Sequence, residues 1–142
     1  MGRSSMAPMP TRPRVYLAGP DVFRPDAEQH FAMLAAVCER HGLEALSPFD
    51  GEVDATSAQA IYDANMAKLR AADGVVANLA PFRGEEPDSG TVFEVGVAAA
   101  RGVPVVGYGA QKLAPGLAGA VTLAESAEEA IRVMAGVLKQ RP

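Results

Sequence analysis

The run GVVANL (residues 74–79) is the strongest strand signal in the chain, because it is short, apolar and begins at a glycine. Comparable runs are RVYLA (residues 14–18) and PVVGY (residues 104–108). Continuous apolar runs of this length predict strands that are buried on both faces, as in a parallel sheet. Two weaker segments, residues 44–46 and 120–123, predict further strands.

Helical patterns separate these runs. Apolar residues at helical spacing predict helices over residues 26–40, 56–72, 91–101 and 126–139. The second and fourth begin with the capping patterns TSAQ (residues 56–59) and SAEE (residues 126–129). Strands that alternate with helices predict an α/β fold, here a single flavodoxin-like or Rossmann-like doubly wound domain. We expect five parallel strands in the order 2-1-3-4-5.

Size and composition exclude several classes of protein. The chain has 142 residues, a length that fits one domain. Its net charge of −4 gives no indication of the excess of basic residues that binds nucleic acids. No apolar run approaches the ~18 residues that span a membrane. Residues 1–13 contain prolines but no apolar signal-peptide core, so we expect a flexible leader, a domain over residues 14–142 and a cytoplasmic location. We therefore expect no nucleic-acid and no membrane partner.

The residues that most often hold metals or act as nucleophiles are few. Cys38 is the single cysteine and falls at an apolar helical position, so we expect a buried thiol. His30 and His41 have no acid or cysteine at metal-ligand spacing, so we expect both to be surface or capping residues. No G-x-G-x-x-G follows the first strand. We expect no metal and no cofactor.

Two carboxylates, Asp88 and Glu94, lie six residues apart where a helix is predicted to begin. Paired carboxylates in a cleft suit chemistry at a sugar carbon. A structural alternative is that Thr91 and Glu94 form a capping box, with Glu94 bound to the Thr91 N–H. At a helix N-terminus we expect Glu94 to be ionised at neutral pH. Gly90 would let a ligand approach the backbone, and Gly96 would let the helix pack closely on a strand.

The topology brings these acids together with two loops. Residues 18–23 follow the first predicted strand, and residues 78–84 follow the third. In doubly wound sheets the carboxyl ends of strands one and three meet at the switch point, where ligands bind. We therefore expect both loops and both acids at one edge of the sheet.

Three segments in combination resemble the nucleoside 2-deoxyribosyltransferases, in the branch that carries a PFRG loop. They are VYLAGPDVF (residues 15–23), PFRG (residues 81–84) and EPDSGTVFEVG (residues 86–96), within a likeness over residues 14–107. The resemblance implies transfer of 2-deoxyribose between nucleobases through a covalent deoxyribosyl-glutamate intermediate. It also implies deoxynucleosides and free nucleobases as partners, a role in nucleotide salvage, and a homo-oligomer.

The resemblance further implies roles for single residues. Glu94 matches the nucleophile and Tyr16 the tyrosine that orients it. Asp88 matches an acid that contacts the base and assists proton transfer, and Asp73 matches a second acid near the base. On their own, Tyr16 fits a core position and Asp73 fits a turn. Substrate-binding residues are expected at Gly19, Pro20, Asp21, Phe23, Asn78, Phe82, Arg83, Ser89 and Gly90.

The chain departs from the resemblance between residues 107 and 123, where the segment after the fourth strand is short and lacks the family's Asn-containing stretch. This implies a wetter sugar site, so we expect some N-glycosidic hydrolysis beside transfer. One alternative function is a 2′-deoxynucleoside 5′-monophosphate N-glycosidase, although Asp21 would repel a phosphate at its loop. The other is a nucleotide-binding module without catalysis.

Overall fold

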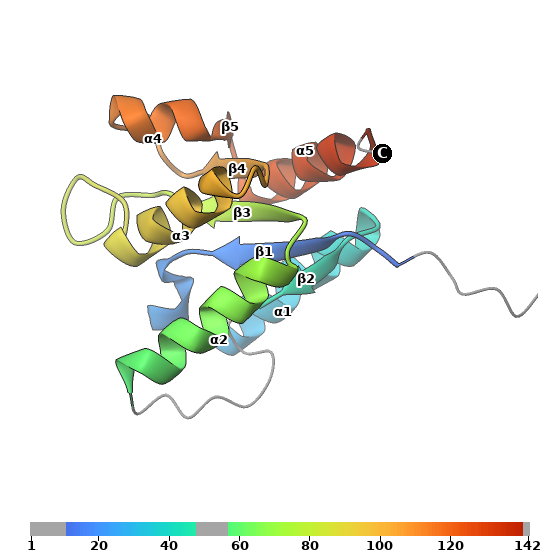
Figure 1. The fold of residues 1–142 in the computed structure, drawn as a ribbon, viewed down its shortest axis with the longest axis horizontal. Helices are drawn as coiled ribbons and strands as arrows, with labels where there is room; N and C mark the ends of the chain where they lie inside the picture. Colours follow the sequence, from blue (N-terminus) through green and yellow to red (C-terminus); the bar gives the residue numbers. More distant parts are fainter. Residues whose placement is uncertain (1–10, 48–56, 141–142) are drawn as a thin grey trace, which may run out of the picture.

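The computed structural model describes residues 11–47 and 57–140, which form a five-stranded parallel sheet with helices on both faces (Figure 1). The strands are β1 (Arg14–Ala18), β2 (Glu44–Leu46), β3 (Gly74–Asn78), β4 (Val105–Tyr108) and β5 (Thr122–Ala124). Their order is β2-β1-β3-β4-β5, and every neighbouring pair is parallel. The predicted order is confirmed, and the switch point lies between β1 and β3.

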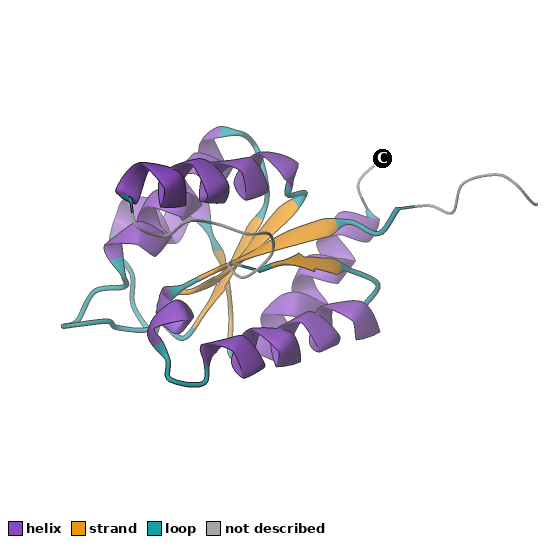
Figure 2. Cartoon of the chain, turned by 90° about the horizontal axis from the view of Figure 1, so that it is seen from below, coloured by secondary structure: helices purple, strands orange, loops and turns teal. Residues whose placement is uncertain are grey.

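The helices form two layers around the sheet (Figure 2). Helices α1 (Ala27–Arg40) and α5 (Ala127–Lys139) share a core with one face, and α2 (Ala58–Ala71) and α3 (Ser89–Ala100) share a core with the other. In β3, Val76 packs in the first core while Val75 and Ala77 pack in the second. Successive side chains of a strand point to opposite faces, so a strand covered on both sides must be apolar throughout.

Helix α2 begins differently from the prediction. Ser57 is its N-cap, and its hydroxyl accepts a hydrogen bond from the Ala60 N–H at 3.0 Å. Thr56, the predicted first cap, lies outside the described residues. The Gln59 side-chain amide donates to Asp63 at 2.9 Å. The capping pattern thus marked the right region and the wrong residue.

The C-terminal elements also differ in part. Ser126 caps α5 as predicted, accepting from the Glu129 N–H at 3.1 Å. A short helix, α4 (Pro115–Ala120), precedes β5 and was not predicted. Its Leu117 packs against the core on the α2 and α3 side. The weak strand expected over residues 120–123 begins only after this helix ends.

The single cysteine lies in the hydrophobic core. Cys38 is fully buried among α1, α5 and the sheet, and burial raises the pKa of its thiol to about 11. The thiol is therefore protonated at neutral pH, and the expectation of a buried thiol is confirmed.

Across residues 11–47 and 57–140, none of the helices combines the length and the apolar character that crossing a membrane requires.

Candidate active site

A tyrosine and a glutamate from distant parts of the chain meet at the carboxyl edge of the sheet. The Tyr16 hydroxyl, on β1, donates a hydrogen bond to Oε2 of Glu94, on α3, at 2.8 Å. Tyr16 is 2% exposed, so its ring belongs to the core while its hydroxyl reaches the site. Burial, followed by the charge of Glu94, raises the pKa of Tyr16 far above its ordinary value. Tyr16 therefore stays protonated and acts as a donor.

This pair lies in a cavity of about 410 Å³. Its walls come from β1 and the loop that follows, from α2 and from the start of α3. Six of the residues expected in the site line it, namely Tyr16, Gly19, Phe23, Asp88, Gly90 and Glu94. The cavity therefore joins the acids and the loop after β1 at the edge where the topology placed them.

Burial controls the charge of Glu94. It raises the pKa of the carboxyl to about 7, and Asp88 adds to the rise, while the Tyr16 hydrogen bond and the charge of Lys68 oppose it. With this pKa, part of the Glu94 population is protonated at neutral pH, whereas the helix N-terminus was expected to keep the carboxyl ionised. Helix α3 begins at Ser89, so Glu94 lies in its second turn, beyond the range of the terminal dipole.

Asp88 is the N-cap of α3. Its Oδ2 accepts hydrogen bonds from the Thr91 N–H and the Thr91 hydroxyl, both at 2.9 Å. The alternative in which Glu94 caps the helix through Thr91 is therefore wrong, because Asp88 already satisfies that N–H and Glu94 binds Tyr16. Asp88 also lines the cavity, so one carboxylate both begins the helix and faces the site.

Two expected substrate residues, Asp21 and Asn78, instead form a partly buried polar network beside the cavity. Asp21 is only 6% exposed and does not line the cavity. Its Oδ1 accepts from Asn78 Nδ2 at 2.9 Å, and its Oδ2 lies 2.6 Å from Nε2 of His30. The expectation that His30 is a surface or capping residue is therefore wrong. The argument that Asp21 repels a phosphate also fails, because its carboxylate is buried and paired.

The PFRG loop packs on the loop after β1. Phe82 stacks on Phe23 with ring centroids 5.6 Å apart, and the Arg83 guanidinium lies 4.7 Å from the Phe82 ring centroid and 5.4 Å from that of Phe23. Phe23 lines the cavity, whereas Pro20, Phe82, Arg83 and Ser89 do not. These last residues thus support the wall or the helix start from outside.

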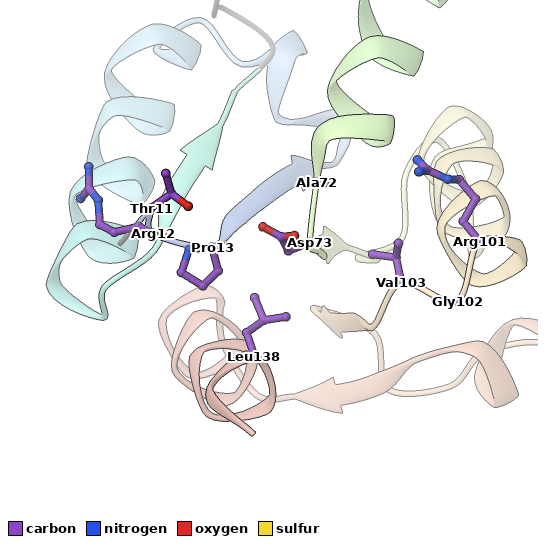
Figure 3. Close-up of a pocket in the computed structure, with 9 residues that line it drawn as sticks. All are labelled: Thr11, Arg12, Pro13, Ala72, Asp73, Arg101, Gly102, Val103 and Leu138. Atoms are coloured by element: carbon purple, nitrogen blue, oxygen red, sulfur yellow. The ribbon is translucent and has the colours of Figure 1, made fainter. Parts of the chain in front are cut away.

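Asp73 lies at the other end of the sheet. It directly precedes β3, and its Oδ2 accepts from the Arg14 N–H at 2.8 Å. Figure 3 shows it in a separate pocket with Arg12, Pro13 and Arg101. The expectation of a catalytic Asp73 is therefore wrong, because residues before and after a parallel strand lie at opposite edges.

Helix α2 supplies a wall that was not predicted from the sequence. The wall residues are Ala58, Ile61, Tyr62, Asn65, Met66 and Leu69. Asn65 is the polar member among apolar neighbours, and its amide can donate and accept hydrogen bonds. The helical spacing of these residues could have revealed the face, since Ile61, Asn65 and Leu69 are four residues apart.

Among the described residues, no group of three or more histidine, cysteine or acidic side chains is placed to hold a metal ion.

Fold and site together define a class, a doubly wound α/β protein with a tyrosine-bound glutamate at the switch point. The profile of a family described as Nucleoside 2-deoxyribosyltransferase matches residues 15–130. The chain belongs to the nucleoside 2-deoxyribosyltransferase family.

Two relatives share 36% sequence identity with the chain. The chain is similar to a 2-desoxiribosyltransferase from Leishmania mexicana, with 36% identity, a TM-score of 0.61, and coverage of 74% of this chain and 76% of that one. It is also 36% identical over 104 residues to the uncharacterized protein C191.05c of Schizosaccharomyces pombe. That match covers 68% of this chain and 49% of the relative, so the chain spans about half of its length.

Two further solved structures share the fold at lower identity. A conserved protein from Enterococcus faecalis V583 has a TM-score of 0.67 at 21% identity, covering 92% of this chain and 99% of that one. A 2-deoxyribosyltransferase from Bacillus psychrosaccharolyticus has a TM-score of 0.64 at 19% identity, covering 82% and 88%. At these identities the likeness concerns the fold alone.

Proposed function

We propose that the protein transfers 2-deoxyribose between nucleobases, with Glu94 as the nucleophile. The observation that carries the proposal is the 2.8 Å hydrogen bond from Tyr16 to Glu94 inside a cavity that Asp88 also lines. A hydrogen bond to one carboxylate oxygen fixes the side chain and leaves the other oxygen free to attack. Family membership and the name of the Leishmania mexicana relative support the choice of a deoxyribosyl group.

In the first step, a Glu94 oxygen forms a bond to C1′ of the sugar while the bond between C1′ and the base nitrogen breaks. The electron pair of that bond leaves with the base, whose nitrogen takes a proton from the Asp88 carboxyl and leaves Asp88 as a carboxylate. In the second step, a nitrogen of the acceptor base attacks C1′ and gives its proton to the Asp88 carboxylate, while the ester bond breaks and Glu94 is released as a carboxylate. Two displacements at one carbon retain its configuration, as in retaining glycosidases.

Water can replace the acceptor base in the second step, which would release free deoxyribose. The cavity rim carries exposed apolar side chains, with Phe23, Tyr62 and Phe93 at 62%, 45% and 50% exposure. Exposed apolar patches at a rim are typical of surfaces that a partner covers. We propose that a second copy of the chain covers this rim and limits hydrolysis.

The test is chromatography of the protein incubated with 2′-deoxyinosine and adenine. We expect 2′-deoxyadenosine from the wild type, and a loss of at least about a thousandfold in Glu94→Gln, because a nucleophile has no substitute. Asp73→Asn is the matched control, since this acid lies at the opposite edge and should keep its activity.

Other outcomes would change the proposal. Hypoxanthine release without new nucleoside would replace transfer by hydrolysis. Reaction of 2′-deoxyinosine 5′-monophosphate in place of the nucleoside would make the protein a nucleotide N-glycosidase. Substrate binding with no turnover of either, unchanged in Glu94→Gln, would make it a binding module.

A further inference from the structure

His30, Asp21 and Asn78 join three separate segments beside the cavity. His30 lies in the first turn of α1, Asp21 lies in η2 (Pro20–Phe23), and Asn78 is the last residue of β3. The Asp21 carboxylate lies 2.6 Å from His30 Nε2 and 2.9 Å from Asn78 Nδ2. Because a carboxylate only accepts hydrogen bonds, both nitrogens are donors.

The network extends into both loops that shape the cavity. Asn78 Oδ1 accepts from the Ala80 N–H at 3.1 Å, which sets the start of the loop that carries Phe82. On the other side, the Asp21 carbonyl accepts from the Arg24 N–H at 3.1 Å, which closes η2. One buried carboxylate therefore holds the segment of Phe23 and the segment of Phe82, the two rings that stack on each other.

An alternative explanation is that these residues only stabilise the fold. A carboxylate that is 6% exposed needs its partners, because an unpaired buried charge is strongly destabilising. Nevertheless the network is placed at the cavity wall and not in the central core. Val22 and Phe23, which directly follow Asp21, line the cavity, and both are exposed to solvent. Phe23 stacks on Phe82, and the network holds the backbone segments of both rings, so the position of this wall depends on the anchor at Asp21.

We propose that His30 is a positioning residue for the substrate: through Asp21 it holds the Val22 and Phe23 wall of the cavity in place. This rests on the proposed function, because the wall matters only if the cavity binds the nucleoside. His30 lies behind the wall and does not line the cavity, so it acts on binding and not on bond breaking.

The test compares His30→Ala with His30→Gln, whose side-chain amide can still donate to Asp21. Gln29→Ala, an exposed change in the same turn of α1, is the matched control. We expect His30→Ala to raise KM for the deoxynucleoside donor about tenfold, the scale of one lost hydrogen bond to a charged group, with kcat within about twofold. His30→Gln should restore KM to within about threefold, and Gln29→Ala should match the wild type.

A second readout needs no activity. Hydrogen exchange of the Arg24 and Ala80 amides should be faster in His30→Ala than in His30→Gln, because both amides bond to groups that the network orders. A lower melting temperature with unchanged KM and unchanged exchange at these two amides would overturn the proposal and leave a stabilising role only. If the wild type transfers no deoxyribose, the proposed function fails, and the exchange data alone then decide whether His30 holds the wall.

Discussion

At the scale of single residues, opposing interactions set the charge of Glu94. Burial raises the pKa of its carboxyl to about 7, while the Tyr16 hydroxyl and the charge of Lys68 act in the other direction. A nucleophile must be ionised, so burial has a cost at neutral pH. A less hydrated carboxylate is also the more reactive one once it is ionised. We therefore expect activity to rise with pH through the region around pH 7.

This pKa makes a prediction about stability. The folded pKa of about 7 lies above the ordinary value of 4.5, so between these values the folded state holds a proton that the unfolded state releases. The stability contributed by protonated Glu94 is complete below about pH 4.5 and is lost as the pH rises through 7. Glu94→Gln, which never ionises, should therefore be more stable than the wild type at pH 8, by on the order of 3 kcal/mol, but not at pH 4.5.

Urea unfolding of both proteins at the two pH values measures this difference. Glu85→Gln, a change at an exposed acid in the loop before α3, is the control and should show no such dependence. An equal difference between Glu94→Gln and the wild type at both pH values would mean that burial does not raise the pKa of Glu94.

At the scale of the elements, the sequence located strands well and helix starts less well. Asp88 and Thr91 are both good capping residues, and the pattern Thr-x-x-Glu favoured the second. In the structure Asp88 accepts the hydrogen bond from the Thr91 N–H. Glu94 instead accepts a hydrogen bond from Tyr16, which lies 78 residues away along the chain. A local sequence pattern contains no information about a hydrogen-bond partner from another element. For this reason the cap was predicted at Thr91 and not at Asp88, although both acids were identified as candidate site residues.

The loop after β1 allows a test at this scale. A Cβ at Gly19 would lie 2.5 Å from Asp21 Oδ1 and 2.8 Å from the Asn78 Cβ, so the chain needs a glycine there for close approach. We expect Gly19→Ala to lower the free energy of unfolding by about 1–3 kcal/mol, as overpacking does. The buried Asp21 and the half-buried Asn78 would have to move apart to admit the methyl group.

Gly96 in α3 is the matched control. Apart from its chain neighbours and the backbone of its own helix, a Cβ there would meet no atom within 4 Å, so the expectation that this glycine permits close packing on a strand is wrong. Gly96→Ala should leave stability unchanged or raise it by up to about 1 kcal/mol, because alanine favours a helix. Denaturant unfolding of both variants is the measurement. Equal effects at the two positions would contradict the close approach at Gly19.

At the scale of the whole molecule, the parallel sheet followed from the apolar runs, because strands buried on both faces need two helical layers, and the strand order followed from the doubly wound fold that five such strands suggest. The same topology could have shown that Asp73 lies away from the candidate site. Asp73 precedes β3 while Asp88 and Glu94 follow it, and the two ends of a parallel strand lie at opposite edges. The network of His30, Asp21 and Asn78 could not be predicted from the sequence, because Asp21 lies 9 residues from His30 and 57 residues from Asn78 along the chain.

The exposed rim of the cavity predicts self-association. Tyr62 and Phe93 are 45% and 50% exposed and face each other with ring centroids 6.3 Å apart. Burying such rings between two copies would stabilise an assembly. Sedimentation of the wild type at micromolar concentration should give a species larger than one chain, and Tyr62→Lys should shift it toward the monomer. Met33→Lys, at an exposed apolar residue of α1 outside the cavity, should not. A wild type that sediments as a monomer would contradict this.

The role of Glu94 as nucleophile is tested most directly by intact-protein mass spectrometry after mixing the protein with 2′-deoxyinosine and no acceptor base. We predict that acid-quenched samples carry the added mass of one deoxyribosyl group, that peptide analysis places it on Glu94, and that adenine added before the quench removes it. Glu94→Gln should carry none. Hypoxanthine release at the same rate in Glu94→Gln as in the wild type, with no added mass in either, would contradict a covalent mechanism through this residue.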